Sequence, residues 1–123
     1  MRASFDIGSV TIGGTTPLVL FAGPCVLESE DLAHEVCTAV KDIAGRLGIG
    51  YVFKSSYDKA NRQRHVSYRG PGIKEGLEIL AGIRNEYGVP VLTDVHSPEE
   101  AQQAGAVVDV VQVPAYLSRQ TDL

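Results

Sequence analysis

The segment "PVLTDVHSPEEAQQAG", residues 90–105, contains a complete change from strand to helix. Its first five residues, 90–94, predict a strand. Ser97 and Pro98 then predict the N-cap and the first position of a helix, and the two glutamates that follow suit the positive end of the helix dipole. Gly105 predicts the end of that helix. A strand followed at once by a helix is the repeating unit of parallel α/β folds.

The same order of elements recurs on both sides of this segment. Ser29 predicts the N-cap of a helix that ends at Gly48, and apolar residues at helical spacing predict a second helix over 73–87, before Gly88. Residues 118–123 read as the beginning of another helix. Further apolar runs predict strands at residues 17–23, which read as buried on both faces, at 51–55 and at 107–113.

Alternating strands and helices predict a parallel α/β fold, either an open doubly wound sheet or a (β/α)₈ TIM barrel. A G-x-G-x-x-G motif does not follow the first strand, which disfavours the nucleotide-binding open sheet. A complete barrel needs about 250 residues, so we expect residues 1–123 to be one partial barrel domain, roughly the first half. Two short strand-like runs around Gly8 predict an N-terminal β-hairpin over 4–12.

Composition limits the class of function. The chain has 44% hydrophobic residues and a net charge of −4, which is typical of a globular protein and argues against nucleic acid or an anionic membrane as a partner. The first residues lack the apolar core of a secretory signal, and no apolar run reaches the length of about 18 residues that a membrane span requires. Two cysteines do not make a disulfide framework. We therefore expect reduced thiols and a cytoplasmic location.

Polar and reactive side chains follow all four predicted strands. In parallel α/β folds, the carboxyl ends of the strands meet at the edge where ligands bind. We therefore expect one site that gathers Cys25 after the first strand, Lys54, Ser55, Asp58, Lys59, Asn61 and Arg62 after the second, Asp94 and His96 after the third, and Gln112 from the fourth.

The segment after the second strand is the most basic part of this acidic chain. Residues 54–72 contain two lysines and three arginines. Clustered lysine and arginine suit phosphorylated small molecules, although a solvated loop with its charges facing water is the alternative. Asp58 and Asn61 could bind sugar hydroxyls, and the position at a strand end favours a site. Arg64 and Arg69 fit the alternative better, and Arg69 could be structural.

Three other residues each allow more than one interpretation. Cys37 lies among apolar residues of the first helix and reads as a packed core residue. Cys25, at a strand end, could be a nucleophile, a thiolate ligand of a metal, or a packed residue. His96 lies two positions after Asp94, so both side chains should share one side of the strand end, and His96 could be a base, a ligand or a hydrogen-bonded turn residue. A buried amide at Gln112 would need hydrogen-bond partners.

The motifs "AGPCVLES", "FKSSYDKANR", "SYRGPG", "TDVH" and "QVPAYLSRQTDL" together resemble the N-terminal half of the 3-deoxy-D-manno-octulosonate 8-phosphate synthase family. The resemblance covers residues 18–123. It implies a (β/α)₈ barrel with an N-terminal hairpin, a homo-oligomer that is usually a tetramer, and a role in lipopolysaccharide sugar biosynthesis. The implied reaction condenses phosphoenolpyruvate with arabinose 5-phosphate and water. The sister 3-deoxy-D-arabino-heptulosonate 7-phosphate synthases share "AGPC" but resemble the chain less.

The resemblance also implies roles for individual residues. Lys54 and Lys59 resemble the lysines that hold phosphoenolpyruvate and stabilise charge at the reacting carbons. Asp94 resembles a catalytic residue of the site, and Cys25 resembles the metal-ligand cysteine of the metal-dependent class. Manganese, iron, cobalt or zinc would suit such a ligand. The residues that resemble substrate-binding positions are Ser55, Asn61 and Arg62, with Arg62 at the phosphate of arabinose 5-phosphate, and Gln112 near phosphoenolpyruvate.

The chain departs from the family pattern after "KANR". The family shows two serines, an apolar residue and a histidine, whereas this chain has Gln63, Arg64, His65 and Val66. The departure affects the part of the site that binds the aldose phosphate. The other metal ligands of the family lie in the second half of the barrel, so we expect the 123-residue chain alone to be inactive. The alternative is a non-catalytic half-barrel that binds phosphate or phosphoenolpyruvate and dimerises through its sheet edges.

Overall fold

The computed structural model describes residues 2–60 and 68–123. It begins with a β-hairpin, in which β1 (Ser4–Ile7) pairs antiparallel with β2 (Val10–Gly13). Gly8, at the turn, has a φ of +56°, a conformation that glycine adopts without steric cost. The hairpin therefore lies where the sequence predicts it.

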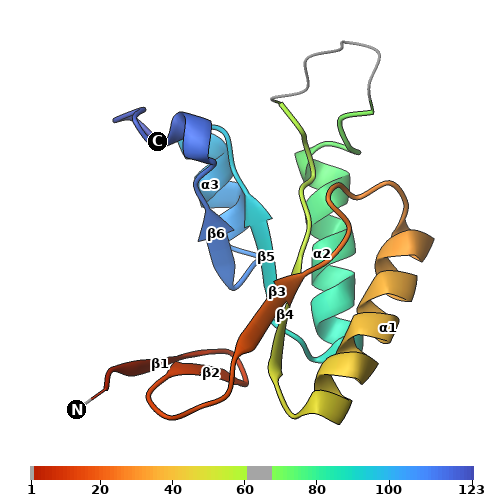
Figure 1. The fold of residues 1–123 in the computed structure, drawn as a ribbon. Coiled ribbons are helices and arrows are strands. Elements are labelled where there is room, and N and C mark those ends of the chain that lie inside the picture. The colour runs from red at the N-terminus through yellow and green to blue at the C-terminus, as the bar shows by residue number, and fades with distance from the viewer. Residues whose placement is uncertain (1, 61–67) are drawn as a thin grey trace.

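A parallel four-stranded sheet forms the centre of the molecule (Figure 1). Its strands, in spatial order, are β3 (Val19–Ala22), β4 (Gly50–Lys54), β5 (Val91–Asp94) and β6 (Val110–Gln112). Spatial order equals chain order, as in a barrel; a doubly wound sheet reverses its order at a switch point. The described part of the chain is thus a partial barrel, as predicted.

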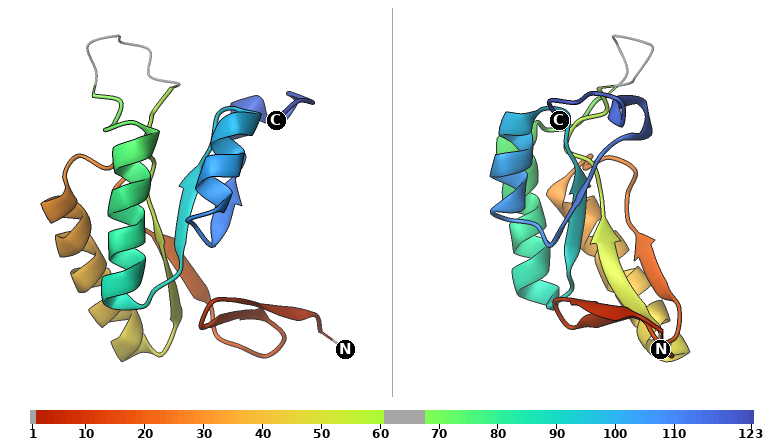
Figure 2. Two further views of the ribbon diagram at one scale, coloured as in Figure 1. Left: turned by 180° about the vertical axis from the view of Figure 1, so that it is seen from behind. Right: turned by 90° about the vertical axis from the view of Figure 1, so that its left-hand side faces the viewer.

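Three helices cover one face of the sheet, as Figure 2 shows from behind. They are α1 (Glu30–Leu47), α2 (Ile73–Tyr87) and α3 (Pro98–Gly105). The predicted helix ends are confirmed: the Ser29 and Ser97 hydroxyls accept backbone N–H groups of the first turns, and Gly48 and Gly88 end α1 and α2 in the left-handed conformation.

Three sequence predictions need correction. The strand in 17–23 is not buried on both faces, because β3 lies at the edge of the described sheet and leaves Phe21 38% exposed. The fourth strand is shorter than 107–113, since the backbone N–H groups of Val107 and Val108 bond to Ala104 and close α3. Residues 118–123 form turns after a short 3₁₀ helix (Ala115–Leu117) rather than beginning an α-helix.

The core lies between the helices and the sheet, and the hairpin lies at the opposite end from the predicted site. Phe53 of β4, Ile83 of α2 and Cys37 of α1 are fully buried there. Gly8 of the hairpin faces Pro90, the residue before β5, so the hairpin covers the amino ends of the strands. No helix in the described ranges is long and apolar enough to cross a membrane.

Two glycines of α2 should respond in opposite ways to substitution by alanine. A Cβ on Gly76 would lie 2.3 Å from the Cβ of Tyr57, whereas a Cβ on Gly82 would meet nothing within 4 Å. We expect Gly82→Ala to stabilise the chain by about 0.5–1 kcal/mol through helix propensity. Gly76→Ala should destabilise it by about 1–3 kcal/mol through overpacking. Urea unfolding measures both, and a stabilised Gly76→Ala variant would contradict the close packing of α2 on Tyr57.

Candidate active site

The segments that follow β3 and β4 remain paired beyond the strand ends. Val26 forms a parallel bridge with Ser56, and the backbone N–H of Ser56 donates to the Cys25 carbonyl. The backbone N–H of Val95, the residue after β5, donates to the carbonyl of Gln112, the last residue of β6. A parallel sheet brings these carboxyl ends to one edge, so residues from all four predicted strand ends lie on one side of the molecule (Figure 1).

The two ends of the basic segment are also held together. The backbone N–H of Lys59 donates to the Arg69 carbonyl at 2.6 Å, and that of Gly72 donates to the Tyr57 carbonyl at 3.1 Å. Gly70 has a φ of +128°, and a Cβ there would lie 2.1 Å from the Tyr57 carbonyl oxygen, so only glycine fits. The position of the Lys59 backbone is therefore set by hydrogen bonds between residues 57–59 and residues 69–72.

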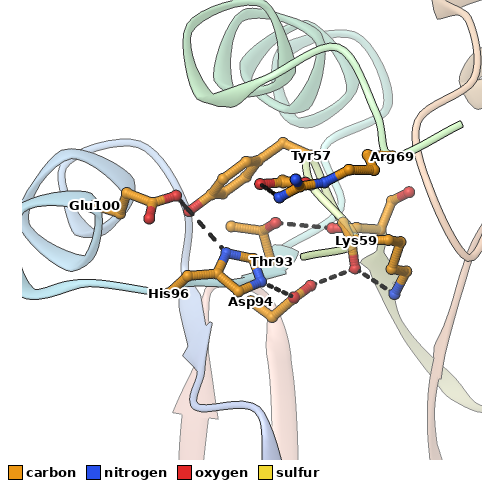
Figure 3. Close-up of polar contacts among 10 residues, drawn as sticks. Tyr57, Lys59, Arg69, Thr93, Asp94, His96 and Glu100 are labelled. Carbon is orange, nitrogen blue, oxygen red and sulfur yellow. Dashed lines mark hydrogen bonds and ion pairs between the residues drawn. The ribbon is translucent and has the colours of Figure 1, made fainter. Parts of the chain in front are cut away.

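A line of polar contacts runs from Lys59 into the sheet (Figure 3). The Lys59 ammonium donates to the Ser56 hydroxyl at 2.6 Å, and that hydroxyl donates to Oδ1 of Asp94. The other carboxylate oxygen of Asp94 lies 3.4 Å from Nε2 of His96. Ser56 and Asp94 are both buried. Since buried polar groups need partners, this line holds the Lys59 cation in place.

The line continues beyond His96 to α3. Nδ1 of His96 lies 3.7 Å from Oε1 of Glu100, and the Tyr57 hydroxyl donates to the same oxygen at 2.7 Å. The pKa of Tyr57 is raised above its usual range, first by burial and then by this hydrogen bond. The hydroxyl therefore keeps its proton and acts as a donor at neutral pH.

A hollow of about 350 Å³ lies beside this line, and Cys25, Lys54 and Lys59 contribute to its walls. Another hollow of about 550 Å³ lies on the outer face, where Glu30, Lys74, Glu75 and Glu78 surround it. The smaller hollow suits an anion better than the larger one, because Lys54 and Lys59 border it, whereas the three glutamates of the larger hollow repel negative charge.

The other predicted site residues are placed in different ways. The Ser55 side chain is buried, and its hydroxyl donates to the Pro24 carbonyl at 2.6 Å. Asp58 accepts two hydrogen bonds of 2.9 Å from the Arg69 guanidinium, which gives Arg69 the structural role that was one of its alternatives. Gln112 is half-buried on β6, opposite Asp94. Substrate contact by Ser55, Asp58 and Gln112 stays a prediction.

Part of the predicted site lies outside the described residues. This applies to Asn61 and Arg62, which were predicted to bind the aldose phosphate. It also applies to Gln63, Arg64, His65 and Val66, which depart from the family pattern. The residues predicted to lie at phosphoenolpyruvate, which are Lys54, Lys59 and Gln112, are all described.

Sequence reasoning missed three residues of the polar line, namely Ser56, Tyr57 and Glu100. Ser56 follows Ser55, which bonds to Pro24, and the strand pattern alone does not say which hydroxyl reaches Asp94. Glu100 was read only as a residue that suits a helix N-terminus. Its spacing of four residues from His96 was the available signal, because side chains at that spacing lie close at a helix start.

The donor set for a metal is small. Across 2–60 and 68–123, no group of three or more histidine, cysteine, aspartate or glutamate residues is arranged to hold a metal ion. Cys25 is exposed, which rules out the packed-residue interpretation and leaves its thiol available as one ligand. A catalytic zinc site, for comparison, has about three protein ligands. The described residues therefore contain no complete metal site, and Cys25 is the ligand that the sequence predicts from among them.

The two cysteines should differ sharply in reactivity. Cys37 is fully buried, and burial raises the pKa of its thiol to about 11, so it carries almost no thiolate at pH 8. Cys25 is exposed. We expect iodoacetamide at pH 8 to add one group to the native chain, at Cys25, and two in denaturant. Peptide mass spectrometry locates the adducts, and native labelling of Cys37 would contradict the packing of α1.

Comparisons with known proteins show the family to which the chain is similar. The model of the DAHP synthetase I family matches residues 2–123. Three curated relatives carry the name 2-dehydro-3-deoxyphosphooctonate aldolase. The protein of Marinobacter nauticus is 51% identical over 122 residues, or 99% of this chain and 43% of its own length. The protein of Fusobacterium nucleatum is 50% identical over 117 residues, which are 95% of this chain and 42% of the relative's own length. The protein of Azoarcus sp. (strain BH72) is 56% identical over 111 residues, which are 90% of this chain and 40% of the relative's own length.

The chain spans about two fifths of the length of these relatives. The match nevertheless includes all six strands and the three helices described above. With the strand order of a barrel and its polar groups at the carboxyl ends of the strands, the chain belongs to the DAHP synthetase I family.

Proposed function

We propose that this chain supplies the phosphoenolpyruvate-binding part of a 3-deoxy-D-manno-octulosonate 8-phosphate synthase. The observation that carries the proposal is the hollow bordered by Lys54 and Lys59, with Lys59 held by buried Ser56 and Asp94. The relatives are named as aldolases of a phosphorylated octonate, and this name supports a reaction that makes or breaks a carbon–carbon bond of an eight-carbon sugar acid. The reaction would join phosphoenolpyruvate, arabinose 5-phosphate and water, and release phosphate.

The residues would divide the work as follows. Lys54 and Lys59 bind the negative charges of phosphoenolpyruvate and stabilise charge that develops as the new bond forms. Asp94 keeps both Ser56 and His96 oriented, so that Lys59 points into the hollow with a fixed direction. His96, two residues after the end of β5, would be a further substrate-binding residue. Asn61 and Arg62 take arabinose 5-phosphate, with Arg62 at its phosphate.

Cys25 would be one ligand of a divalent metal, which is manganese, iron, cobalt or zinc, and the other ligands come from outside the described residues. Such an ion, when bound, would orient or activate the water and the aldehyde of arabinose 5-phosphate. A chelator should stop turnover of the complete enzyme, and Mn²⁺ should restore it. Cys25→Ala should prevent that recovery. Turnover that a chelator leaves unchanged would contradict a metal role for Cys25.

The test of the proposal is a chimera that joins this chain to the remaining part of the Marinobacter nauticus relative. We expect it to release phosphate from phosphoenolpyruvate only when arabinose 5-phosphate is present. A folded chimera that binds phosphoenolpyruvate and releases no phosphate would overturn the enzyme proposal in favour of a binding module. A preference for erythrose 4-phosphate would assign the chain to the heptulosonate synthases instead.

We also propose a cytoplasmic location and a homo-oligomer, in line with a biosynthetic enzyme that uses phosphorylated substrates. Light scattering of the purified chimera measures its molar mass and hence its oligomeric state. A monomer at enzyme-assay concentrations would contradict that part of the proposal, and fractionation of the source cells would test the location.

A further inference from the structure

Arg69 contacts Lys59 and the residue before it through two different groups. Its guanidinium donates two hydrogen bonds of 2.9 Å to the Asp58 carboxylate, from Nε to Oδ1 and from Nη2 to Oδ2. Its backbone carbonyl accepts the Lys59 N–H at 2.6 Å, and Figure 3 shows the two residues close together. Arg69 thus holds the side chain at position 58 and the backbone at position 59.

The geometry of the Asp58–Arg69 pair restricts more than a distance. A planar guanidinium that donates two parallel hydrogen bonds to a carboxylate also fixes the angle between the two groups. The Asp58 and Arg69 side chains are 29% and 51% exposed, and exposed ion pairs add little to the free energy of unfolding. The main effect of the pair is therefore on local geometry, and Lys59 is the next residue along the chain.

Lys59 depends on such support because its side chain is long and flexible. The ammonium is held by the Ser56 hydroxyl at 2.6 Å, a contact that requires the Lys59 backbone to keep its place at the end of β4. We infer that Asp58 and Arg69 are positioning residues, which act as a pair on the Lys59 backbone and so keep the ammonium at the hollow that it borders. The inference rests on the proposed function, because that function places phosphoenolpyruvate in this hollow.

A lysine that is ordered before the substrate arrives need not be ordered on binding, and ordering one long side chain costs about 2- to 10-fold in affinity. We expect Arg69→Met and Asp58→Asn each to weaken phosphoenolpyruvate binding by this factor. The double variant should bind no more weakly than either single one. Isothermal titration measures the affinities. Since no aldose phosphate is present, a contact between Asp58 and a sugar hydroxyl does not affect them.

A Lys59→Met background separates positioning from direct contact. There, Arg69→Met should leave the remaining affinity unchanged, because the pair acts only through the lysine. A further loss in that background would mean that Arg69 itself contacts phosphoenolpyruvate, and it would overturn the inference. Unchanged affinity of Arg69→Met or of Asp58→Asn alone would also overturn it.

Asp42 and Arg46 form the matched control pair. They lie one turn apart on α1, exposed, with Nε of Arg46 3.1 Å from Oδ2 of Asp42, and neither borders the candidate site. Asp42→Asn and Arg46→Met change the net charge in the same way and should leave the affinity unchanged. Equal losses in both pairs would reduce the effect to net charge and contradict the inference. Urea unfolding checks that each variant is folded.

A measurement without substrate tests the pair by itself. In Arg69→Met, hydrogen exchange of the Lys59 amide should be about 2- to 5-fold faster, the factor that corresponds to the usual strength of an exposed ion pair. The Val95 amide, which donates to Gln112, should exchange as in the unsubstituted chain. An unchanged Lys59 rate would overturn the inference. A faster rate, in a chain that does not bind phosphoenolpyruvate at all, would count against the proposed function alone.

Discussion

Replacing Lys59 by methionine should lower the affinity of the chain for phosphoenolpyruvate by about 10- to 100-fold, because a charge-assisted hydrogen bond contributes about 1.5–3 kcal/mol. The ammonium that is lost borders the hollow of the candidate site. Methionine keeps most of the length and apolar surface of the side chain. Isothermal titration or ligand-observed NMR with phosphoenolpyruvate measures the change.

The effect should be on binding and not on folding. Lys59 is half-buried, and Ser56 still donates to Asp94 when the lysine is absent, so the buried carboxylate keeps that partner. Lys74→Met is the matched control, since Lys74 is exposed at the start of α2 on the outer face. Equal affinities for the two variants would show that the hollow between β3 and β4 does not bind the substrate.

Replacing Phe53 by alanine should destabilise the chain by about 3–5 kcal/mol, the usual cost of removing a buried phenylalanine. Phe53 is fully buried in β4, the strand that pairs with both β3 and β5. Domains of this size are stable by about 5–15 kcal/mol in total, so the loss removes a large part of the stability. The midpoint of thermal unfolding should fall by about 10 °C or more.

The matched control is Phe5→Ala, the same chemical change on the hairpin. Phe5 is 60% exposed, and its removal should cost well under about 1 kcal/mol. Differential scanning calorimetry compares the two variants. Similar losses of stability in the two variants would mean that β4 does not lie at the centre of the folded chain. The arrangement of the strand ends described above would then be wrong too.

The fold class and most element boundaries could be predicted from the sequence because their signals are local. Ser29 bonds to the backbone three residues away, Ser97 does the same, and Gly48 and Gly88 each supply one left-handed residue. Capping and helical periodicity are decided within one turn of chain. The gathering of polar residues at one edge followed from these elements, since parallel strands share a direction.

What the sequence by itself determined was therefore the order of strands and helices and the edge of the sheet where the site lies. Only the tertiary structure decided how the side chains pair there. Ser56 reaches Asp94 across 38 positions and Tyr57 reaches Glu100 across 43, while Asp58 turns to Arg69. It also decided the exposure of β3, which depends on its edge position. These contacts join residues far apart in the chain, and no local pattern specifies which of several polar neighbours a buried group will meet.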